Sequence, residues 1–178
     1  MKFIKSTKGA WRGFLGAMLA IVALNLLSEQ FPLPDNYEDL MRQLTHRWIG
    51  IISIALICPI LEELIFRLAI CGGMLHFHVR PWIAIMVSAI CFGIAHWNPA
   101  QTPFAIGMGL VMGLLYWRNG LWLSILVHVT NNSVALLEEY ALGDRFQGFT
   151  MTDAIGGPVV AWTVIVIMAA ASIKLLRN

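Results

Sequence analysis

The chain alternates between long apolar stretches and short polar connections. Six apolar stretches can be marked, each near the roughly 20 residues that a helix needs to cross a bilayer, with two somewhat short. This pattern predicts an all-α, polytopic membrane helix bundle that forms a single domain over residues 1–178. The expected spans are residues 11–27, 48–75, 81–97, 104–117, 121–137 and 158–176.

Composition supports a membrane protein. Hydrophobic residues make up 58% of the 178 positions and charged residues 12%, whereas soluble domains are about 45–50% apolar and about 25% charged. The net charge is only +2, and no basic run with interleaved aromatics is present, so the expected partner is the lipid bilayer and not nucleic acid. Cys58, Cys71 and Cys91 fall inside apolar stretches, and we expect them to be unpaired and buried.

The charges outside the spans are distributed unevenly. If the N-terminus is cytoplasmic and the spans alternate, the inner side carries eight basic residues and no acid, and the outer side three basic and eight acidic residues. This bias follows the positive-inside rule and predicts cytoplasmic termini in a multi-pass cell-membrane protein. The basic lead resembles a signal peptide, but no convincing cleavage site follows, so an uncleaved first helix is expected. The inner residues are Lys2, Lys5, Lys8, Arg12, Arg80, Arg118, Lys174 and Arg177, and the outer ones are Arg42, Arg47, Arg145, Glu29, Asp35, Glu38, Asp39, Glu138, Glu139, Asp144 and Asp153.

Three charged residues interrupt the second span, in the stretch CPILEELIFRLA. A charge at the centre of a spanning helix costs about 2.5–3.5 kcal/mol. Glu63 and Arg67 are four residues apart and can neutralise each other, but Glu62 points about 100° away and has no such partner in sequence. In an α-helix Pro59 cannot donate to the carbonyl of Ala55, so a kink and a freed backbone acceptor are expected close to Glu62.

Polar residues also occur in two other spans. His96 lies near the outer end of the third span, and His128 and Asn132 lie on one face of the fifth. A lone histidine in an apolar helix is most often a satisfied core residue. Here, however, three spans carry a carboxylate, two imidazoles and a carboxamide. Each of these groups needs a hydrogen-bond partner away from lipid. We therefore expect Glu62, His96, His128 and Asn132 to surround one polar cavity.

Two kinds of amide hydrolysis fit this set of side chains. In the first, Glu62 is the general base for a water that a histidine orients, while an imidazole and the Asn132 amide stabilise the oxyanion. In the second, Glu62, His96 and His128 bind a metal whose water is the nucleophile, although no HExxH motif is present. A small transporter with an intramembrane proton relay is a less favoured third interpretation.

These residues belong to three short motifs, EELIFR at Glu62–Arg67, FGIAH at Phe92–His96 and HVTNN at His128–Asn132. Together they resemble the EExxxR, FxxxH and HxxxN pattern of the CPBP family, also called Abi, of CAAX-type prenyl proteases and bacteriocin-processing enzymes. The resemblance covers about 70 residues of the chain. Glu63 and Arg67 match the rest of the first motif and fit the supporting pair argued above.

The resemblance implies an intramembrane endopeptidase of the glutamic type in a bacterial inner membrane, without a metal or other cofactor. Glu62 and His96 would activate the water, and His128 and Asn132 would form the oxyanion hole. The substrate would be a hydrophobic or membrane-anchored peptide.

The small size of the chain bears on the substrate. Six spans lack the additional helices of the eukaryotic prenyl proteases, which favours a peptide precursor or a C-terminal sorting segment over a prenylated CAAX protein. The alternatives are a non-catalytic membrane immunity or anchoring protein of the same fold, and a zinc-dependent version of the peptidase.

Overall fold

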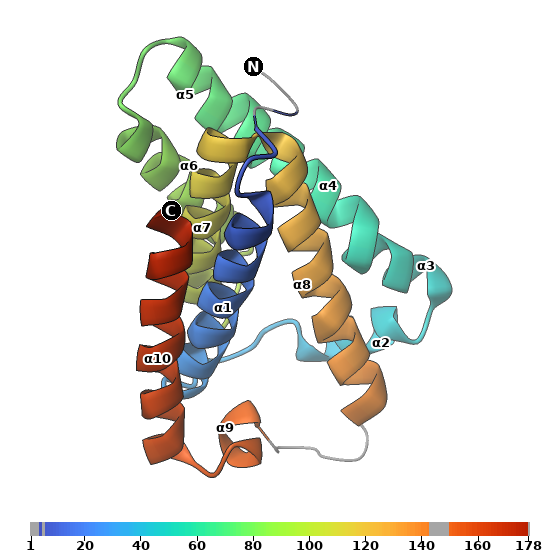
Figure 1. The fold of residues 1–178 in the computed structure, drawn as a ribbon. Helices are drawn as coiled ribbons and strands as arrows, with labels where there is room; N and C mark the ends of the chain where they lie inside the picture. The colour runs from blue at the N-terminus through green and yellow to red at the C-terminus, as the bar shows by residue number, and fades with distance from the viewer. Residues whose placement is uncertain (1–3, 5, 143–149, 178) are drawn as a thin grey trace.

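The computed structural model describes residues 4, 6–142 and 150–177, and every regular element in these ranges is a helix (Figure 1). The prediction of an all-α membrane helix bundle is confirmed. Among the described residues, three helices are long and apolar enough to cross a membrane: Ala10–Glu29, Trp48–His76 and Pro158–Arg177. The total of six spans stays a prediction. Among the charges assigned above to the two sides, Lys2, Lys5, Asp144 and Arg145 lie outside the described residues.

The helices begin and end close to the expected positions. The largest difference is at the C-terminal end of the fifth expected span, where the helix continues to Leu142. A short helix between the first two long ones begins after Pro34 and Asp35. The elements are α1 (Ala10–Glu29), α2 (Glu38–Thr45), α3 (Trp48–Ile52), η1 (Ser53–Ile57), α4 (Cys58–Glu62), η2 (Glu63–Cys71), α5 (Gly72–His76), α6 (Pro81–Ala95), α7 (Thr102–Asn119), α8 (Leu121–Leu142), α9 (Met151–Ala154) and α10 (Pro158–Arg177).

The run from α3 to α5 is one continuous helix that changes its winding along its length. The segments η1 and η2 are π-helical, so their backbone hydrogen bonds reach back five residues instead of four. At the end of η1 the Cys58 N–H donates to the Ser53 carbonyl in this wider register. Pro59 follows directly and begins α4. The expected disturbance at this proline therefore takes the form of a π-helical segment on its N-terminal side.

Helices α6 and α7 pack closely through small residues. A Cβ atom added at Gly109 would lie 3.0 Å from the Cα of Ala89, and one added at Gly113 would lie 2.9 Å from the Ile85 side chain. Ala105, one turn before Gly109, is fully buried. The stripe of small residues at every fourth position of α7 is therefore a packing surface, as its spacing indicates.

The expectation that all three cysteines are buried is wrong for two of them. All three are free thiols, but only Cys71 is buried. Cys91 lies between the exposed side chains of Ile90 and Ile94, on an outward face of α6. Cys58 is exposed to the cavity described below. An apolar segment of a membrane protein has one face towards lipid, so its apolar residues are not all buried in protein.

Helices α1 and α8 enclose a space that widens along the molecule. They meet near the start of both helices, where the Gly13 Cβ position is 3.2 Å from the Leu123 side chain. Towards their other ends they diverge, and α2 and α9 lie at the wide end (Figure 1). The Glu29 carboxylate ties α9 to α1 by accepting hydrogen bonds from the backbone N–H groups of Met151 and Thr152.

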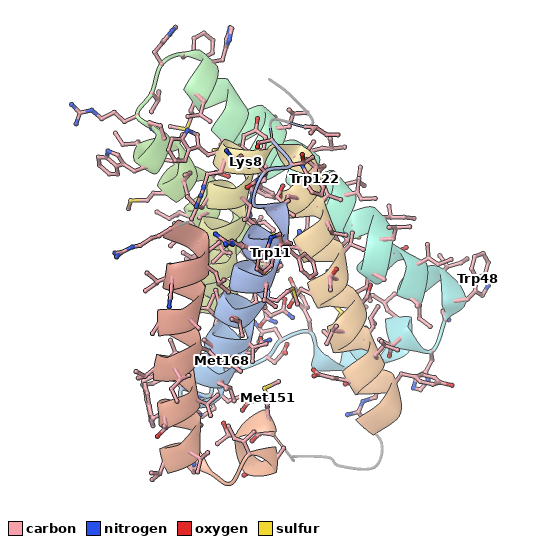
Figure 2. The ribbon with its side chains drawn as sticks, in the orientation of Figure 1. Lys8, Trp11, Trp48, Trp122, Met151 and Met168 are labelled. Atoms are coloured by element: carbon pink, nitrogen blue, oxygen red, sulfur yellow. The ribbon has the colours of Figure 1, made fainter. Side chains whose placement is uncertain are left out.

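The core beside this space is built from α1, α6, α7 and α8. Its buried residues include Ala17, Ile21, Phe92, Ala105, Met108, Met112, Leu115, Leu123 and Val127. At the outer edge, Trp48 points away from the body of the molecule at the start of α3 (Figure 2). Its side chain is 70% exposed, as is typical of tryptophans at a membrane–water interface.

Candidate active site

A cavity of about 1550 Å³ fills the space between α1 and α8. Its lining includes Glu62 from α4, His96 at the end of α6, and His128 and Asn132 from α8. Met151 of α9 borders it as well and points into the space between the diverging helices (Figure 2). The structure thus brings the four residues expected to surround a polar cavity to one cavity.

A fully buried glutamate connects the charged pair of the second span to α8. Glu63 and Arg67 are both 0% exposed, and Glu63 Oε2 lies 3.4 Å from Arg67 Nε. The other carboxylate oxygen, Oε1, lies 3.1 Å from Nδ1 of His128. The predicted Glu63–Arg67 pair is present, and its glutamate also holds a site histidine.

The guanidinium of Arg67 has two further partners that the sequence did not predict. Its Nη1 donates to the Ser88 hydroxyl at 2.9 Å, and that hydroxyl donates to the Phe66 carbonyl at 2.7 Å. Its Cζ lies 4.8 Å from the ring centroid of Phe92, a cation–π contact. Ser88 precedes Phe92 by one helical turn, so the spacing Ser-x-x-x-Phe was the available signal.

The hydrogen-bond partners of the two histidines define their tautomers. Nδ1 of His96 lies 2.9 Å from the Phe92 carbonyl, and Nδ1 of His128 faces the Glu63 carboxylate. A carbonyl and an ionised carboxylate only accept hydrogen bonds, so each Nδ1 carries a proton. Each Nε2 is therefore left for the chemistry of the cavity.

Glu62 is the accessible carboxylate of the site. Its side chain is 31% exposed, in contrast to the adjacent and fully buried Glu63. Its Oε2 lies 3.5 Å from Nε2 of His128. One imidazole thus lies between two consecutive glutamates, with a buried carboxylate at Nδ1 and an accessible one at Nε2.

Asn132 contacts the backbone of the second span. Its Nδ2 donates to the Ile54 carbonyl at 3.1 Å, and its Oδ1 accepts a hydrogen bond from Asn131 Nδ2 at 3.2 Å. The carbonyl expected to be freed by Pro59 was that of Ala55, which holds for an α-helix. In the π-helical register of η1 the carbonyl opposite Pro59 is that of Ile54, one residue earlier, and it accepts its hydrogen bond from Asn132.

The metal interpretation was tested against the geometry of the donors. Imidazole Nε2 atoms and a carboxylate are suitable ligands for zinc by type. Within the described part of the chain, however, no group of three His, Cys, Asp or Glu side chains converges closely enough to hold a metal ion. These side chains do not fit a metal site in this arrangement.

The fold and the site define a membrane helix bundle with a buried glutamate–histidine–arginine cluster beside a large cavity. Residues 44–134 match the family described as type II CAAX prenyl endopeptidase Rce1-like. This match covers half of the chain and includes all three motifs, so the chain belongs to that family.

Two curated proteins are similar to the chain. One is the membrane-embedded CAAX protease MroQ of Staphylococcus aureus (strain USA300), 32% identical over 95 residues, which are 50% of this chain and 38% of MroQ. The other is named "Putative membrane peptidase YdiL", from Bacillus subtilis (strain 168), 32% identical over 88 residues, which are 49% of this chain and 36% of YdiL. The match thus spans little more than a third of either relative. No solved structure matches the chain.

Proposed function

We propose that the chain is an intramembrane endopeptidase of the glutamic type that hydrolyses a peptide bond in a hydrophobic or membrane-anchored substrate. The observation that carries this proposal is the accessible Glu62 carboxylate beside His128 Nε2, with the buried Glu63 behind the same imidazole. Family membership and the names of the two relatives point to the same activity.

Glu62 acts as the general base in this proposal. Its carboxylate takes a proton from a water in the cavity, and the water oxygen attacks the carbonyl carbon of the scissile peptide. His96 accepts the second hydrogen of that water at Nε2, because its Nδ1–H is held by the Phe92 carbonyl. Glu62 then delivers the proton to the leaving amine, so that its carboxylate is regenerated.

His128 and Asn132 stabilise the oxyanion that forms on the peptide carbonyl. For this role the Nε2 side of His128 faces the carbonyl oxygen, while the Glu63 carboxylate holds Nδ1 and so fixes the orientation of the ring.

The cavity suits an extended peptide better than a small molecule. Its volume of about 1550 Å³ exceeds the roughly 300–1,000 Å³ of small-ligand sites. It is bordered by apolar side chains such as Phe104 and Met108 as well as by the polar site residues. A peptide precursor or a C-terminal sorting segment is the substrate class that we propose.

In the membrane orientation that we propose, the mouth of the cavity lies outside the cytoplasm. The start of α1, the α5–α6 and α7–α8 connections and the end of α10 lie at one end of the molecule (Figure 1). These segments carry the described members of the basic inner set, including Lys8, Arg80 and Arg118. The wide end of the cavity, bordered by α2, α9 and Glu139, lies at the opposite end. By the positive-inside rule, substrate enters from the extracytoplasmic side.

The central experiment compares the peptides of the membrane and secreted fractions between wild type and a Glu62→Ala strain, followed by cleavage of the candidate in proteoliposomes. Glu62→Ala, His96→Ala and His128→Ala should each lower the cleavage rate by about 100-fold or more, while the protein still accumulates. His78→Ala, at an exposed loop histidine, serves as the control and should cleave normally. Full processing by Glu62→Ala would overturn the proposal, and binding or protection that survives it would indicate a non-catalytic protein.

Two further measurements test the finer parts of the proposal. A purified protein that contains stoichiometric zinc, and that loses activity to a chelator and regains it with metal, would replace the glutamic assignment. The orientation is tested with single cysteines in a background without Cys58, Cys71 and Cys91. A cysteine introduced by Glu139→Cys should react with a membrane-impermeant maleimide in intact cells, and one introduced by His76→Cys only after permeabilisation. The reverse result would place the mouth of the cavity on the cytoplasmic side.

A further inference from the structure

One backbone carbonyl beside the site faces a proline in the π-helical register and not an N–H donor. In η1 the Ser53 carbonyl accepts a hydrogen bond from the Cys58 N–H, five residues later. The next carbonyl in this register, that of Ile54, faces Pro59, which has no N–H to donate. Instead, Nδ2 of Asn132 from α8 donates to the Ile54 carbonyl at 3.1 Å.

The side-chain amide of Asn132 is oriented for this contact. Asn131, the preceding residue of α8, donates from its Nδ2 to the Asn132 Oδ1 at 3.2 Å. With its oxygen held in this way, the amide nitrogen of Asn132 faces the second span. One N–H of this nitrogen is used by Ile54, and the second remains for the oxyanion role proposed above.

We propose that Asn132 is a positioning residue that closes the π-helical segment η1 at the carbonyl left open by Pro59, and so fixes Glu62 relative to His128. Pro59 and Glu62 are three residues apart on the second span, and His128 and Asn132 are four apart on α8. The catalytic role of Glu62 rests on the proposed function, whereas the closure of η1 does not.

The two helices are joined at two points by this arrangement. One is the Asn132–Ile54 hydrogen bond and the other is His128 between Glu62 and Glu63. Without Asn132 the Ile54 carbonyl has no donor in the π-helical register, so η1 must change its winding, and Glu62 lies eight residues further along the same helix. Loss of the Asn132 contact should therefore displace the Glu62 carboxylate from His128 without removing either group.

The test is a double-mutant cycle between Asn132→Ala and Pro59→Ala. Alanine at position 59 supplies the N–H that the π-helical register lacks, so the Ile54 carbonyl regains a partner without Asn132. In the wild-type background Asn132→Ala should lower the unfolding midpoint in detergent by about 2–8 °C. In the Pro59→Ala background that decrease should shrink by at least half. An equal decrease in both backgrounds would overturn the proposal.

A matched control comes from the same helix. The Thr130 hydroxyl bonds only the Leu126 carbonyl of its own helix among the described contacts, so Thr130→Ala should have the same effect in both backgrounds. A second measurement uses a carbon-13 label on the Ile54 carbonyl, whose amide I band should move to higher wavenumber in Asn132→Ala. An unchanged band would overturn the proposal even if Pro59→Ala does not accumulate.

Cleavage assays separate positioning from oxyanion stabilisation. If Asn132 positions Glu62, the Pro59→Ala/Asn132→Ala protein should cleave at least several-fold faster than Asn132→Ala alone. Pro59→Ala should give no such recovery to His128→Ala. If Pro59→Ala/Asn132→Ala cleaves no faster than Asn132→Ala, Asn132 contributes only to stability, and its positioning role is overturned. Absence of cleavage by the wild type would instead overturn the endopeptidase proposal and leave the closure of η1 standing.

Discussion

The Glu63–Arg67 pair permits a sharp test of how this chain tolerates charge inside a membrane helix. Both side chains are 0% exposed, and Arg67 Nη2 makes no hydrogen bond within the described part of the chain. Glu63→Gln keeps the size of the side chain and an oxygen that accepts from His128 Nδ1–H, but it removes the negative charge. Arg67 would then be a buried cation with only the Ser88 hydroxyl and the face of Phe92 as partners.

The expected cost follows from the burial of the pair. Removing one partner of a fully buried ion pair costs about 3–5 kcal/mol, because the other charge stays desolvated. For a chain of this length each kcal/mol lowers the unfolding midpoint by about 2–4 °C, so Glu63→Gln should lower it by about 6–20 °C. Replacing both charges with neutral groups of similar volume removes the penalty. The Glu63→Gln/Arg67→Met protein should therefore recover most of the lost stability.

Thermal unfolding of the four proteins of this cycle in one detergent measures the coupling directly. Glu62→Gln is the matched control, because the neighbouring carboxylate is 31% exposed and should cost far less when neutralised. If the effects of Glu63→Gln and Arg67→Met simply add in the double variant, the two residues do not compensate each other. The reasoning about mutual neutralisation would then be refuted.

Two other predictions concern the parts of the molecule that frame the cavity. Gly50→Ala would place a methyl group against the backbone carbonyl of Leu44. Because backbone cannot move aside as a side chain can, this variant should be destabilised by about 1–3 kcal/mol in the thermal unfolding assay. Gly73→Ala has open space around the added methyl group and should be nearly neutral in the same assay. At the start of α9, hydrogen bonds from the Thr150 backbone N–H and hydroxyl hold the pKa of Asp153 below its ordinary value of 3.8. The resulting stabilisation is present above that ordinary value and is lost as the pH falls through the lowered pKa, so Asp153→Asn should flatten this part of the pH–stability profile.

The helical bundle and the shared cavity could be predicted because both follow from the cost of polar groups in lipid. Apolar length identified the helices, and four polar side chains without local partners indicated a common site. Glu62 had no partner in its own helix, and its nearest basic group is His128, which is 66 residues later in the chain. The sequence showed that Glu62 needed a partner of this kind but not which atom of which histidine would be nearest.

The two histidine tautomers and the role of Ser88 could not be predicted, because they depend on side-chain contacts between helices. Nδ1 of His96 is satisfied within its own helix by the Phe92 carbonyl, a contact that the spacing Phe-x-x-x-His permits but does not require. Nδ1 of His128 is satisfied across two helices by Glu63. The same residue type thus reaches the same tautomer in two ways, and only the structure distinguishes them.

The winding of the second span limits prediction in a more general way. A proline shows that some carbonyl will lack its partner, but the identity of that carbonyl depends on whether the preceding turn is α-helical or π-helical. The register of η1 assigns it to Ile54, and Asn132 on α8 satisfies it. The choice of winding is therefore coupled to a residue 78 positions away in the chain. The sequence around Pro59, read as an α-helix, points to the Ala55 carbonyl, and it could not predict that Asn132 of α8 donates to the Ile54 carbonyl.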